Sequence, residues 1–472
     1  MGAVNARSSR VVILGGGPGG YEAALVAAHL GAEVTVVERT GIGGAAVLTD
    51  CVPSKTLIST ADYLSDFETA ADLGVHLEDD EGDEVADARA DLPEVNRRVL
   101  ELARAQSSDI TARLGEVGVR VVEGAASLVA PGTVRVEGAD GADDGRLDAD
   151  VVLVATGASP RVVPTAVPDG ERILTWQQIY DLRELPERLV VVGSGVTGAE
   201  LAQAYLGLGS EVVLVSSRDR VLPGEDPDAA AVIEDVFRKR GMEVLGRSRM
   251  AAVERVEGGV VVRLEDGREV TGTHALLAVG SVPSTRGIGL EEVGVDLLPS
   301  GHVAVDRVSR TSVRGVYAAG DCTGVLPLAS VAAMQGRIAM SHALGDAVAP
   351  LQLGVVSANI FTDPEIATVG ITQKDVDEER VDAEVLMLPL SRNPRAKMLG
   401  ITDGFVKLFA QKGSGAVVGG VVVAPRASEL IFPVTLAVQH RLNVDQVAST
   451  FTVYPSLSGS IAEAARRLHP IA

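Results

Sequence analysis

The chain has 472 residues, and its 42 Lys and Arg against 64 Asp and Glu give a net charge of −22. A chain of this length forms several domains, because single hydrophobic cores stop growing at about 250 to 300 residues. The negative field repels phosphate backbones and anionic membrane surfaces, so nucleic acid is excluded as an expected partner.

The short apolar runs and the small number of cysteines limit the possible classes of protein further. Hydrophobic residues make up 46% of the chain, but no run approaches the roughly 18 apolar residues of a membrane span. The first ten residues, MGAVNARSSR, lack the apolar region of a signal peptide, so we expect a cytoplasmic protein. The two Cys and seven His show no metal-ligand spacing, so we expect no metal.

The first predicted element is a strand from Val11 to Leu14, followed by a glycine turn, a helix and a second strand. Gly15, Gly17 and Gly20 form GxGxxG, and Glu38 ends the second strand. The first glycine makes the turn, the second admits a pyrophosphate to the helix N-terminus, and the third allows close packing. Glu38 would accept hydrogen bonds from ribose hydroxyls. This pattern predicts a dinucleotide-binding βαβ unit.

A single cysteine follows this unit. The segment from Gly41 to Lys55 reads GIGGAAVLTDCVPSK, in which Cys51 has Ala46 five positions before it. The chain's other cysteine, Cys322, is far away in sequence. No local dithiol can form, so whatever this protein reduces must be reduced without a CxxxxC couple.

Several further elements are predicted between and after the nucleotide motifs. The acidic stretch from Leu77 to Asp91 is expected to be a solvated loop or helix start without a function. Helices are predicted over 95–114, 427–440 and 459–468, and strands around 119–122, 134–136, 151–155, 405–409 and 417–423. From about Leu351 this pattern indicates a separate α+β domain.

A second dinucleotide signature follows the predicted strand from Leu189 to Val192. Its glycines are Gly193, Gly195 and Gly198, and the position that matches Glu38 is Ser216.

An acid at that position would repel a 2′-phosphate, whereas Ser216, Ser217 and Arg218 could bind one. The second site therefore favours NADP(H) over NAD(H), although Arg218 and Arg220 could equally be solvated surface charges.

Seven motifs carry a resemblance that spans nearly the whole chain. In chain order they read GGGPGGYEAA, CVPSK, VATGASP, GSGVTGAE, AVGSVPST, VYAAGDC and FTDPEIATVG. Their order resembles that of the class I flavoprotein disulfide reductases, the pyridine nucleotide-disulfide oxidoreductases, such as lipoamide dehydrogenase and glutathione reductase. The resemblance implies FAD in the first site, NADPH or NADH in the second, and a homodimer whose subunits complete each other's active sites.

The implied fold is α/β, with two Rossmann-like nucleotide-binding domains and a C-terminal α+β dimerisation domain. Residues 1–160 and 281–347 would form the FAD-binding domain, residues 161–280 the NAD(P)-binding domain, and residues 348–472 the dimerisation domain. The residues implied to bind FAD are Gly15, Gly17, Gly20, Glu38, Gly44, Lys55, Ala126, Thr156, Gly157, Asp321 and Ala329. Those implied to bind NAD(P) are Gly193, Gly195, Gly198, Glu200, Ser216, Ser217, Arg218 and Gly280.

The same resemblance assigns catalytic roles. Lys55 would stabilise negative charge on reduced flavin, and Glu200 would orient it; the alternative for Glu200 is a first-turn acid on the helix dipole. Cys51 matches the flavin-proximal thiol but is expected to be a packing residue rather than a nucleophile. Where the family carries HPxxxE, this chain has Tyr454 at the His position and Gly459 at the Glu position. The dithiol route is therefore lost at both ends.

An acceptor must then reach the flavin directly, which favours a quinone. The chain resembles the LpdA-type NAD(P)H quinone reductases that lack the cysteine pair, so we expect two-electron quinone reduction by ping-pong kinetics, with Tyr454 of the partner subunit lining the acceptor pocket. Three alternatives stay open: a soluble pyridine nucleotide transhydrogenase, a peroxide-sensing sulfenic acid at Cys51, and a vestigial or structural relative of dihydrolipoamide dehydrogenase.

Overall fold

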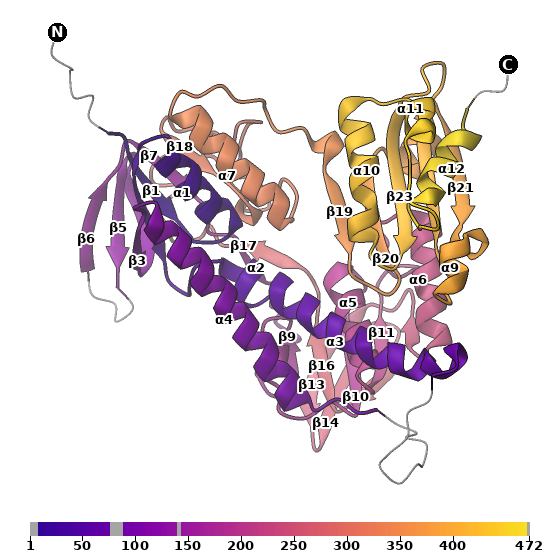
Figure 1. The fold of residues 1–472 in the computed structure, drawn as a ribbon. Coiled ribbons are helices and arrows are strands. Elements are labelled where there is room, and N and C mark those ends of the chain that lie inside the picture. Colours follow the sequence, from indigo (N-terminus) through magenta and orange to yellow (C-terminus); the bar gives the residue numbers. More distant parts are fainter. Residues whose placement is uncertain (1–7, 76–87, 139–142, 470–472) are drawn as a thin grey trace. The chain divides into compact units, whose positions relative to one another are not determined.

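The computed structural model describes residues 8–75, 88–138 and 143–469 of the chain (Figure 1). The chain divides into two compact units, each assembled from three segments. The first unit comprises Met1–Ser54, Arg97–Arg161 and Gly280–Gln352. The second unit comprises Lys55–Asn96, Val162–Val279 and Leu353–Ala472. The predicted division into three domains stays a prediction.

The first unit is built on a five-stranded parallel sheet in the order β18-β7-β1-β2-β3. Its strands are β1 (Arg10–Leu14), β2 (Glu33–Glu38), β3 (Arg120–Glu123), β7 (Val151–Val154) and β18 (Val316–Ala318). Its helices are α1 (Pro18–His29), α2 (Gly44–Leu48), the start of α3 (Cys51–Thr69), most of α4 (Leu92–Glu116), and α7 (Ala329–Ala343). The inner strands β1 and β7 are buried on both faces of the sheet, and the sequence supplies the continuous apolar runs that this requires.

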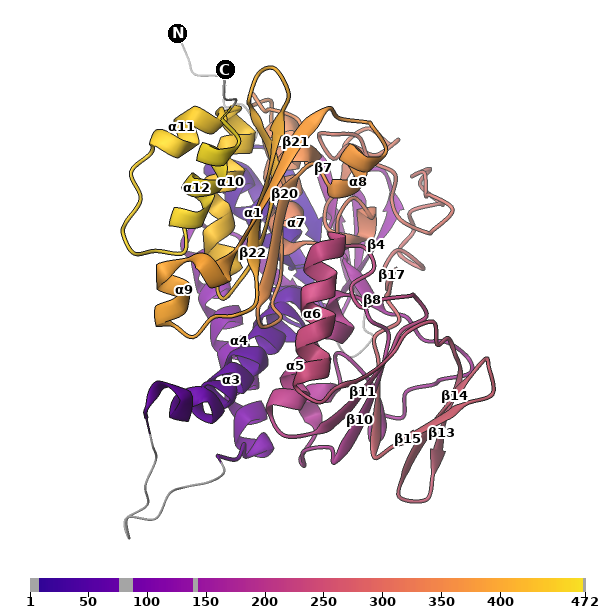
Figure 2. The same ribbon diagram turned by 90° about the vertical axis from the view of Figure 1, so that its right-hand side faces the viewer.

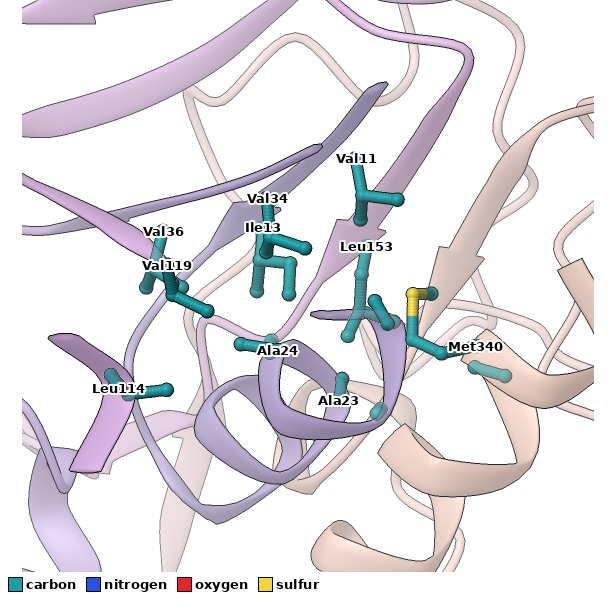
Figure 3. Packing of buried hydrophobic residues seen from close by; sticks show 14 of the residues in the cluster. Val11, Ile13, Ala23, Ala24, Val34, Val36, Leu114, Val119, Leu153 and Met340 are labelled. Carbon is teal, nitrogen blue, oxygen red and sulfur yellow. The ribbon is translucent and has the colours of Figure 1, made fainter. Parts of the chain in front are cut away.

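The alternation of side chains along β1 creates two cores. Val11 and Ile13 point to one face, where they pack among residues of α1, α4 and α7 (Figure 3). Val12 and Leu14 point to the other face, towards the small sheet of β4 (Ala125–Ala130), β5 (Thr133–Glu137) and β6 (Asp143–Asp148). Helix α1 is lined with small residues such as Ala23 and Ala24, which let it approach the strands closely. The glycine turn is thereby held at the carboxyl end of β1.

The second unit repeats this design. A parallel sheet in the order β12-β11-β10-β16-β9 comprises β9 (Ile173–Thr175), β10 (Arg188–Val192), β11 (Glu211–Val215), β12 (Glu243–Leu245) and β16 (His274–Leu277). Its helices are α5 (Val196–Gly207) and α6 (Pro227–Lys239), and an antiparallel sheet comprises β13 (Met250–Val256), β14 (Gly259–Leu264) and β15 (Glu269–Gly272). The predicted order of strand, helix and strand is confirmed in both nucleotide motifs.

The C-terminal part of the second unit is an antiparallel sheet in the order β19-β20-β23-β22-β21 (Figure 2). Its strands are β19 (Ser357–Ile360), β20 (Glu365–Gly370), β21 (Ala383–Pro389), β22 (Phe405–Gln411) and β23 (Val417–Ala424). Helices α10 (Ala427–His440) and α12 (Gly459–Arg467) share one apolar core with this sheet. The expectation of an α+β arrangement from about residue 351 is confirmed.

The remaining short elements connect these layers. They are η1 (Ala70–Leu73), β8 (Ala158–Pro160), η2 (Ile179–Asp181), β17 (Ser281–Pro283), η3 (Asp321–Thr323), η4 (Leu353–Val355), α8 (Gln373–Asp377), η5 (Leu390–Arg392), α9 (Pro394–Met398) and α11 (Val444–Ser449). Most of the acidic stretch from Leu77 to Asp91 lies outside the described residues, but Asp91 precedes α4 and accepts a hydrogen bond from the Glu94 amide. Within the described part of the chain, no helix is long and apolar enough to span a membrane.

Candidate active site

The first glycine turn has the contacts that its spacing predicts. Gly15 has a φ of +102°, and a Cβ there would lie 2.3 Å from the Ala155 carbonyl oxygen. A Cβ at Gly20 would lie 1.9 Å from the carbonyl oxygen of Gly15. At Gly17, directly before α1, a Cβ would meet no atom within 4 Å. The turn is therefore closed at its first and third glycines and open at the second, as approach of a pyrophosphate requires.

The second glycine turn reproduces this arrangement. Gly193 has a φ of +112°, and a Cβ there would lie 2.2 Å from the Ala278 carbonyl oxygen. A Cβ at Gly198 would lie 1.8 Å from the Gly193 carbonyl oxygen, whereas Gly195, before α5, has no atom within 4 Å of a Cβ. The two units thus present the same open helix N-terminus, which fits two nucleotide ligands.

Glu38 organises the loops around the first turn. One carboxylate oxygen accepts the Gly16 amide at 2.6 Å, and the other accepts the amide and hydroxyl of Thr40 at 2.7 and 2.8 Å. A carboxylate has about four acceptor positions, so one is left for a ribose hydroxyl. Gly44, with a φ of +56°, brings the next loop so close that a Cβ would lie 2.9 Å from the Gly17 Cα.

Other residues of the first unit support a bound flavin nucleotide. The Thr156 hydroxyl oxygen is buried and has no hydrogen-bond partner among the described residues, which suits a polar ligand atom. Gly157, which follows it, has a φ of +67°. Burial raises the pKa of Asp321 at the start of η3, and the nearby His302 opposes this rise.

The remaining predicted flavin and nicotinamide contacts are less distinctive. Ala126 is half-buried in β4, where it pairs with Val136, and Ala329 is an exposed residue at the start of α7. Lys55 belongs to the second unit and Gly280 to the first. The structure therefore places each of these residues without testing its contact with a nucleotide.

Lys55 and Glu200 are brought together, as the resemblance implies. The Lys55 Nζ, on α3, lies 2.7 Å from Glu200 Oε2 on α5. Glu200 is 2% exposed, and its Oε1 accepts the Phe361 amide at 2.8 Å. The same ammonium group lies 5.0 Å from the centre of the Phe361 ring. The first turn of α5 contains no acidic residue, so Glu200 is not the helix-dipole acid of the alternative reading. It fixes the position of a cation.

The chain around Phe361 and Asp363 completes this arrangement, and the sequence analysis gave it no role. The Asp363 amide donates to Gln203 Oε1 at 2.8 Å, three residues along α5 from Glu200. Arg240 pairs with the Asp363 carboxylate at 2.5 Å. The sequence did contain a signal for these residues, because both Phe361 and Asp363 lie in the motif FTDPEIATVG, which is one of the seven motifs of the family resemblance.

The two thiols lie in different surroundings. Cys51 is half-buried at the first residue of α3, and Ala46 lies in α2. Cys322 is fully buried, with its Sγ 3.3 Å from the Ala319 carbonyl oxygen, and burial raises its pKa to about 11. Cys322 is therefore a residue of the hydrophobic core.

Ser216 differs from its predicted role. Its side chain is fully buried, and its Oγ accepts hydrogen bonds from the Ser194 hydroxyl at 2.7 Å and the Arg218 amide at 3.1 Å. The hydroxyl is used within the protein, which corrects the expectation that it contacts a 2′-phosphate directly. Ser217 and Arg218 are exposed and keep that role as a prediction.

Tyr454 lies in an exposed apolar segment before α12. Phe451 is 102% exposed, Val453 is 78% exposed and Tyr454 is 83% exposed. Gly459, at the position of the family's Glu, is the first residue of α12. No acid–base pair is therefore formed by these two positions, and the role of Tyr454 stays a prediction.

Comparisons with known proteins agree with this geometry. A family model described as pyridine nucleotide-disulphide oxidoreductase matches residues 9–336, and the model of the corresponding dimerisation domain matches residues 356–465. The NAD(P)H dehydrogenase (quinone) of Mycobacterium tuberculosis is 56% identical over 469 residues, which cover 98% of this chain and 94% of that protein. The dihydrolipoyl dehydrogenase of Bacillus subtilis is 32% identical and covers 96% of this chain and 95% of its own.

Solved structures with similar folds agree with these family matches. The crystal structure of LpdA from Mycobacterium tuberculosis superposes with a TM-score of 0.92 at 54% identity, covering 98% of this chain and 100% of that one. The flavoprotein disulfide reductase RclA from Escherichia coli has a TM-score of 0.85 at 23% identity, with coverage of 97% and 99%. The RclA match concerns the fold alone.

Proposed function

The chain belongs to the pyridine nucleotide-disulphide oxidoreductase family, and we propose that it is a FAD-dependent NAD(P)H dehydrogenase that reduces quinones without a dithiol. The relative that is 56% identical carries the name NAD(P)H dehydrogenase (quinone). The observation that carries the proposal is Ala46, because it removes the second thiol that a disulfide relay needs.

FAD fits the first unit. The open N-terminus of α1 at Gly17 would hold its pyrophosphate, and Glu38 would accept a ribose hydroxyl. The buried hydroxyl of Thr156, which has no partner among the described residues, would meet a polar atom of the flavin nucleotide. When bound, FAD supplies a carrier that takes a hydride from NAD(P)H and gives two electrons to an acceptor.

Lys55 and Glu200 provide the electrostatic part of the mechanism. The 2.7 Å pair holds the Lys55 ammonium group in one place, and the Phe361 amide fixes the other oxygen of the carboxylate. A cation held in this way stabilises developing negative charge without reorganising during the reaction. Because Glu200 is 2% exposed, water does not compete for the pair from its carboxylate side.

The absence of a thiol route for the electrons is the reason for proposing a quinone as the acceptor. Cys51 has no second thiol at position 46, and Cys322 is buried in the core with a pKa raised to about 11. At position 454 a tyrosine stands where thiol chemistry would need an imidazole, the side chain that titrates near neutrality. A planar acceptor that takes electrons directly, such as a quinone, requires neither group.

The acceptor pocket is proposed to include Tyr454 of the partner subunit. A dimerisation domain matches residues 356–465, and the exposed side chains of Phe451, Val453 and Tyr454 fall within it. A second copy of the chain would cover these apolar groups and bring the tyrosine to the active site. Replacement of Tyr454 by Ala, with unchanged quinone kinetics, would remove this part of the proposal.

A panel of acceptors tests the function. Anaerobic NADPH oxidation would be measured with a benzoquinone, lipoamide and thio-NAD in parallel. Rapid turnover with the quinone and none with lipoamide is the expected result. Lipoamide turnover at a similar rate would refute the proposal, and thio-NAD turnover exceeding that of the quinone would instead identify a transhydrogenase.

A further inference from the structure

The loop that carries Tyr454 is held by few polar contacts. It connects α11 and α12, and its residues 451–455 make no hydrogen bond to any other residue that the structure describes. The side chains of Phe451, Val453 and Tyr454 are all exposed. Directly after this stretch, Leu457 packs against the apolar core of the C-terminal sheet. The position of Tyr454 therefore depends on what holds the chain at the end of the loop.

Asn393 holds that end of the loop, which passes close to α9 (Figure 2). Its side-chain nitrogen donates to the Ser456 carbonyl oxygen at 3.0 Å and to the Ser460 hydroxyl at 2.8 Å. Ser456 follows Tyr454 by two positions, and Ser460 is a buried residue in the first turn of α12. Within the described part of the chain, no other hydrogen bond joins residues 450–458 to a distant segment.

The same side chain caps α9. Asn393 Oδ1 accepts the Arg395 amide at 2.8 Å and the Ala396 amide at 3.2 Å, which are the contacts of an N-cap residue. A side-chain amide has two N–H donors and two acceptor positions on its oxygen, and all four are used here. Backbone amides only donate and a carbonyl only accepts, so these partners fix the orientation of the amide. An aspartate would cap α9 equally well but would donate nothing to the loop.

We propose that Asn393 is a positioning residue for quinone reduction, because it sets where the Tyr454 loop lies when a partner subunit receives the loop at its acceptor pocket. This inference rests on the proposed function and on the proposed place of Tyr454. A loop that is already held in its working position loses less conformational entropy when the acceptor binds, and this raises affinity. Asn393 has no part in the transfer of hydride from NADPH to FAD, so its effect belongs to the oxidation of reduced FAD alone.

Asn393→Asp tests this role in the FAD-loaded protein while retaining a cap for α9. Its second carboxylate oxygen would face the Ser456 carbonyl, so that contact would become repulsive. Stopped-flow mixing measures the two half-reactions separately. Reduction of FAD by NADPH should run as in the unmodified protein, whereas oxidation of reduced FAD by a low concentration of benzoquinone should slow about tenfold, the effect of losing two neutral hydrogen bonds.

The matched control is Asn443→Asp, which adds the same charge at another helix cap. Asn443 caps α11 through its Oδ1, and its side-chain nitrogen donates no hydrogen bond to a residue that the structure describes. Both half-reactions of this variant should therefore run at the unmodified rate. A second comparison combines Asn393→Asp with Tyr454→Ala. Oxidation of FAD should be no slower than in Tyr454→Ala alone, because no ring remains for the loop to place.

Three results would overturn the inference. They are an unmodified rate of FAD oxidation in Asn393→Asp, an equal slowing of both half-reactions, which a purely structural role would produce, and additive losses in the double variant. An unmodified protein that reduces no quinone would overturn this inference together with the proposed function. Quinone turnover that Asn393→Asp leaves unchanged would overturn only the inference.

Discussion

The Lys55 ammonium group lies 2.7 Å from Glu200 Oε2, while Glu200 Oε1 receives the Phe361 amide. Helix α3, helix α5 and the chain before β20 are thereby joined at one nearly buried carboxylate. Removal of one partner from a buried pair leaves an uncompensated charge, which costs about 3 to 5 kcal/mol. The pair therefore contributes to the stability of the second unit, and in the proposed mechanism it also sets the electrostatics of hydride transfer.

Glu200→Gln is expected to slow hydride transfer. The amide keeps the shape of the side chain and an oxygen for Phe361, but it loses the charge that holds Lys55. We expect anaerobic stopped-flow reduction of the bound FAD by NADPH to slow by about tenfold or more. The control is Glu101→Gln, which removes an exposed pair with Arg97 on α4. Full activity of Glu200→Gln with normal FAD content would contradict the proposed role.

The second and third glycines of the second turn, Gly195 and Gly198, should respond differently to replacement by alanine. The new Cβ of Gly195→Ala would lie within 4 Å of no other atom, so the protein should fold normally. The methyl group would, however, occupy the space of the proposed pyrophosphate. NADPH affinity should drop on the order of tenfold. Gly198→Ala places a Cβ 1.8 Å from the Gly193 carbonyl and should lower the melting temperature. Tight NADPH binding by Gly195→Ala would refute this assignment of the turn.

Lys407 forms a buried ion cluster outside the active site. Its Nζ lies 2.9 and 2.8 Å from the two oxygens of Asp226 and 2.5 Å from Asp228, and its side chain is 2% exposed. Asp226 also caps α6. Lys407→Met should lower the free energy of unfolding by about 3 to 5 kcal/mol, because Asp226 keeps a buried charge.

A double variant separates charge from packing at this cluster. Adding Asp226→Asn to Lys407→Met removes the uncompensated carboxylate, retains a helix-capping side chain, and should restore part of the stability in urea unfolding. The matched control Lys412→Met breaks the exposed pair with Asp382 and should cost far less stability, because solvent screens that pair. Equal losses for Lys407→Met and Lys412→Met would show that burial of the cluster contributes nothing.

Asp62 makes stability depend on pH. Burial raises its pKa from 3.8 to about 7, and the Asp363 carboxylate adds to the rise while Arg240 opposes it. A carboxyl that binds its proton more tightly in the folded state lowers the free energy of unfolding as pH rises between these two values. Asp62→Asn should therefore stabilise the protein by on the order of 1 kcal/mol at pH ~8.

This gain should shrink below pH ~7 and disappear near pH ~4, where the carboxyl is protonated in both states. Urea unfolding at a series of pH values measures it. Thr60→Ser on the same helix supplies the control, because it changes no ionisable group, and its difference from the unmodified protein should not vary with pH. A constant difference between Asp62→Asn and the unmodified protein across this range would contradict the prediction.

The sequence predicted those features whose causes are local. Gly15, Gly17 and Gly20 act through contacts within one turn, and their spacing therefore predicts the geometry. Pairing between distant residues was not predictable in the same way. Lys407 meets an acid 181 positions earlier in the chain, and no periodicity marks either residue.

Ser216 is a second case in which the sequence could not predict the contacts of a side chain. Its position matched a ligand-binding acid, but the sequence did not reveal that burial and Ser194 would occupy its hydroxyl. The closeness of Arg247 to Arg218 was not predictable from the sequence either, because the pairing of two strands brings these distant residues together. Lys55 and Glu200 were found together only through the family resemblance, since they are 145 positions apart.

The central claim is that electrons reach the acceptor without a thiol, and anaerobic quinone reduction by Cys51→Ser tests it most directly. Serine is close in size to cysteine and cannot carry electrons as a disulfide, so turnover per bound FAD should equal that of the unmodified protein. FAD content, measured by its absorbance, controls for disturbed packing at the start of α3. Loss of quinone turnover in a fully FAD-loaded Cys51→Ser variant would contradict the account.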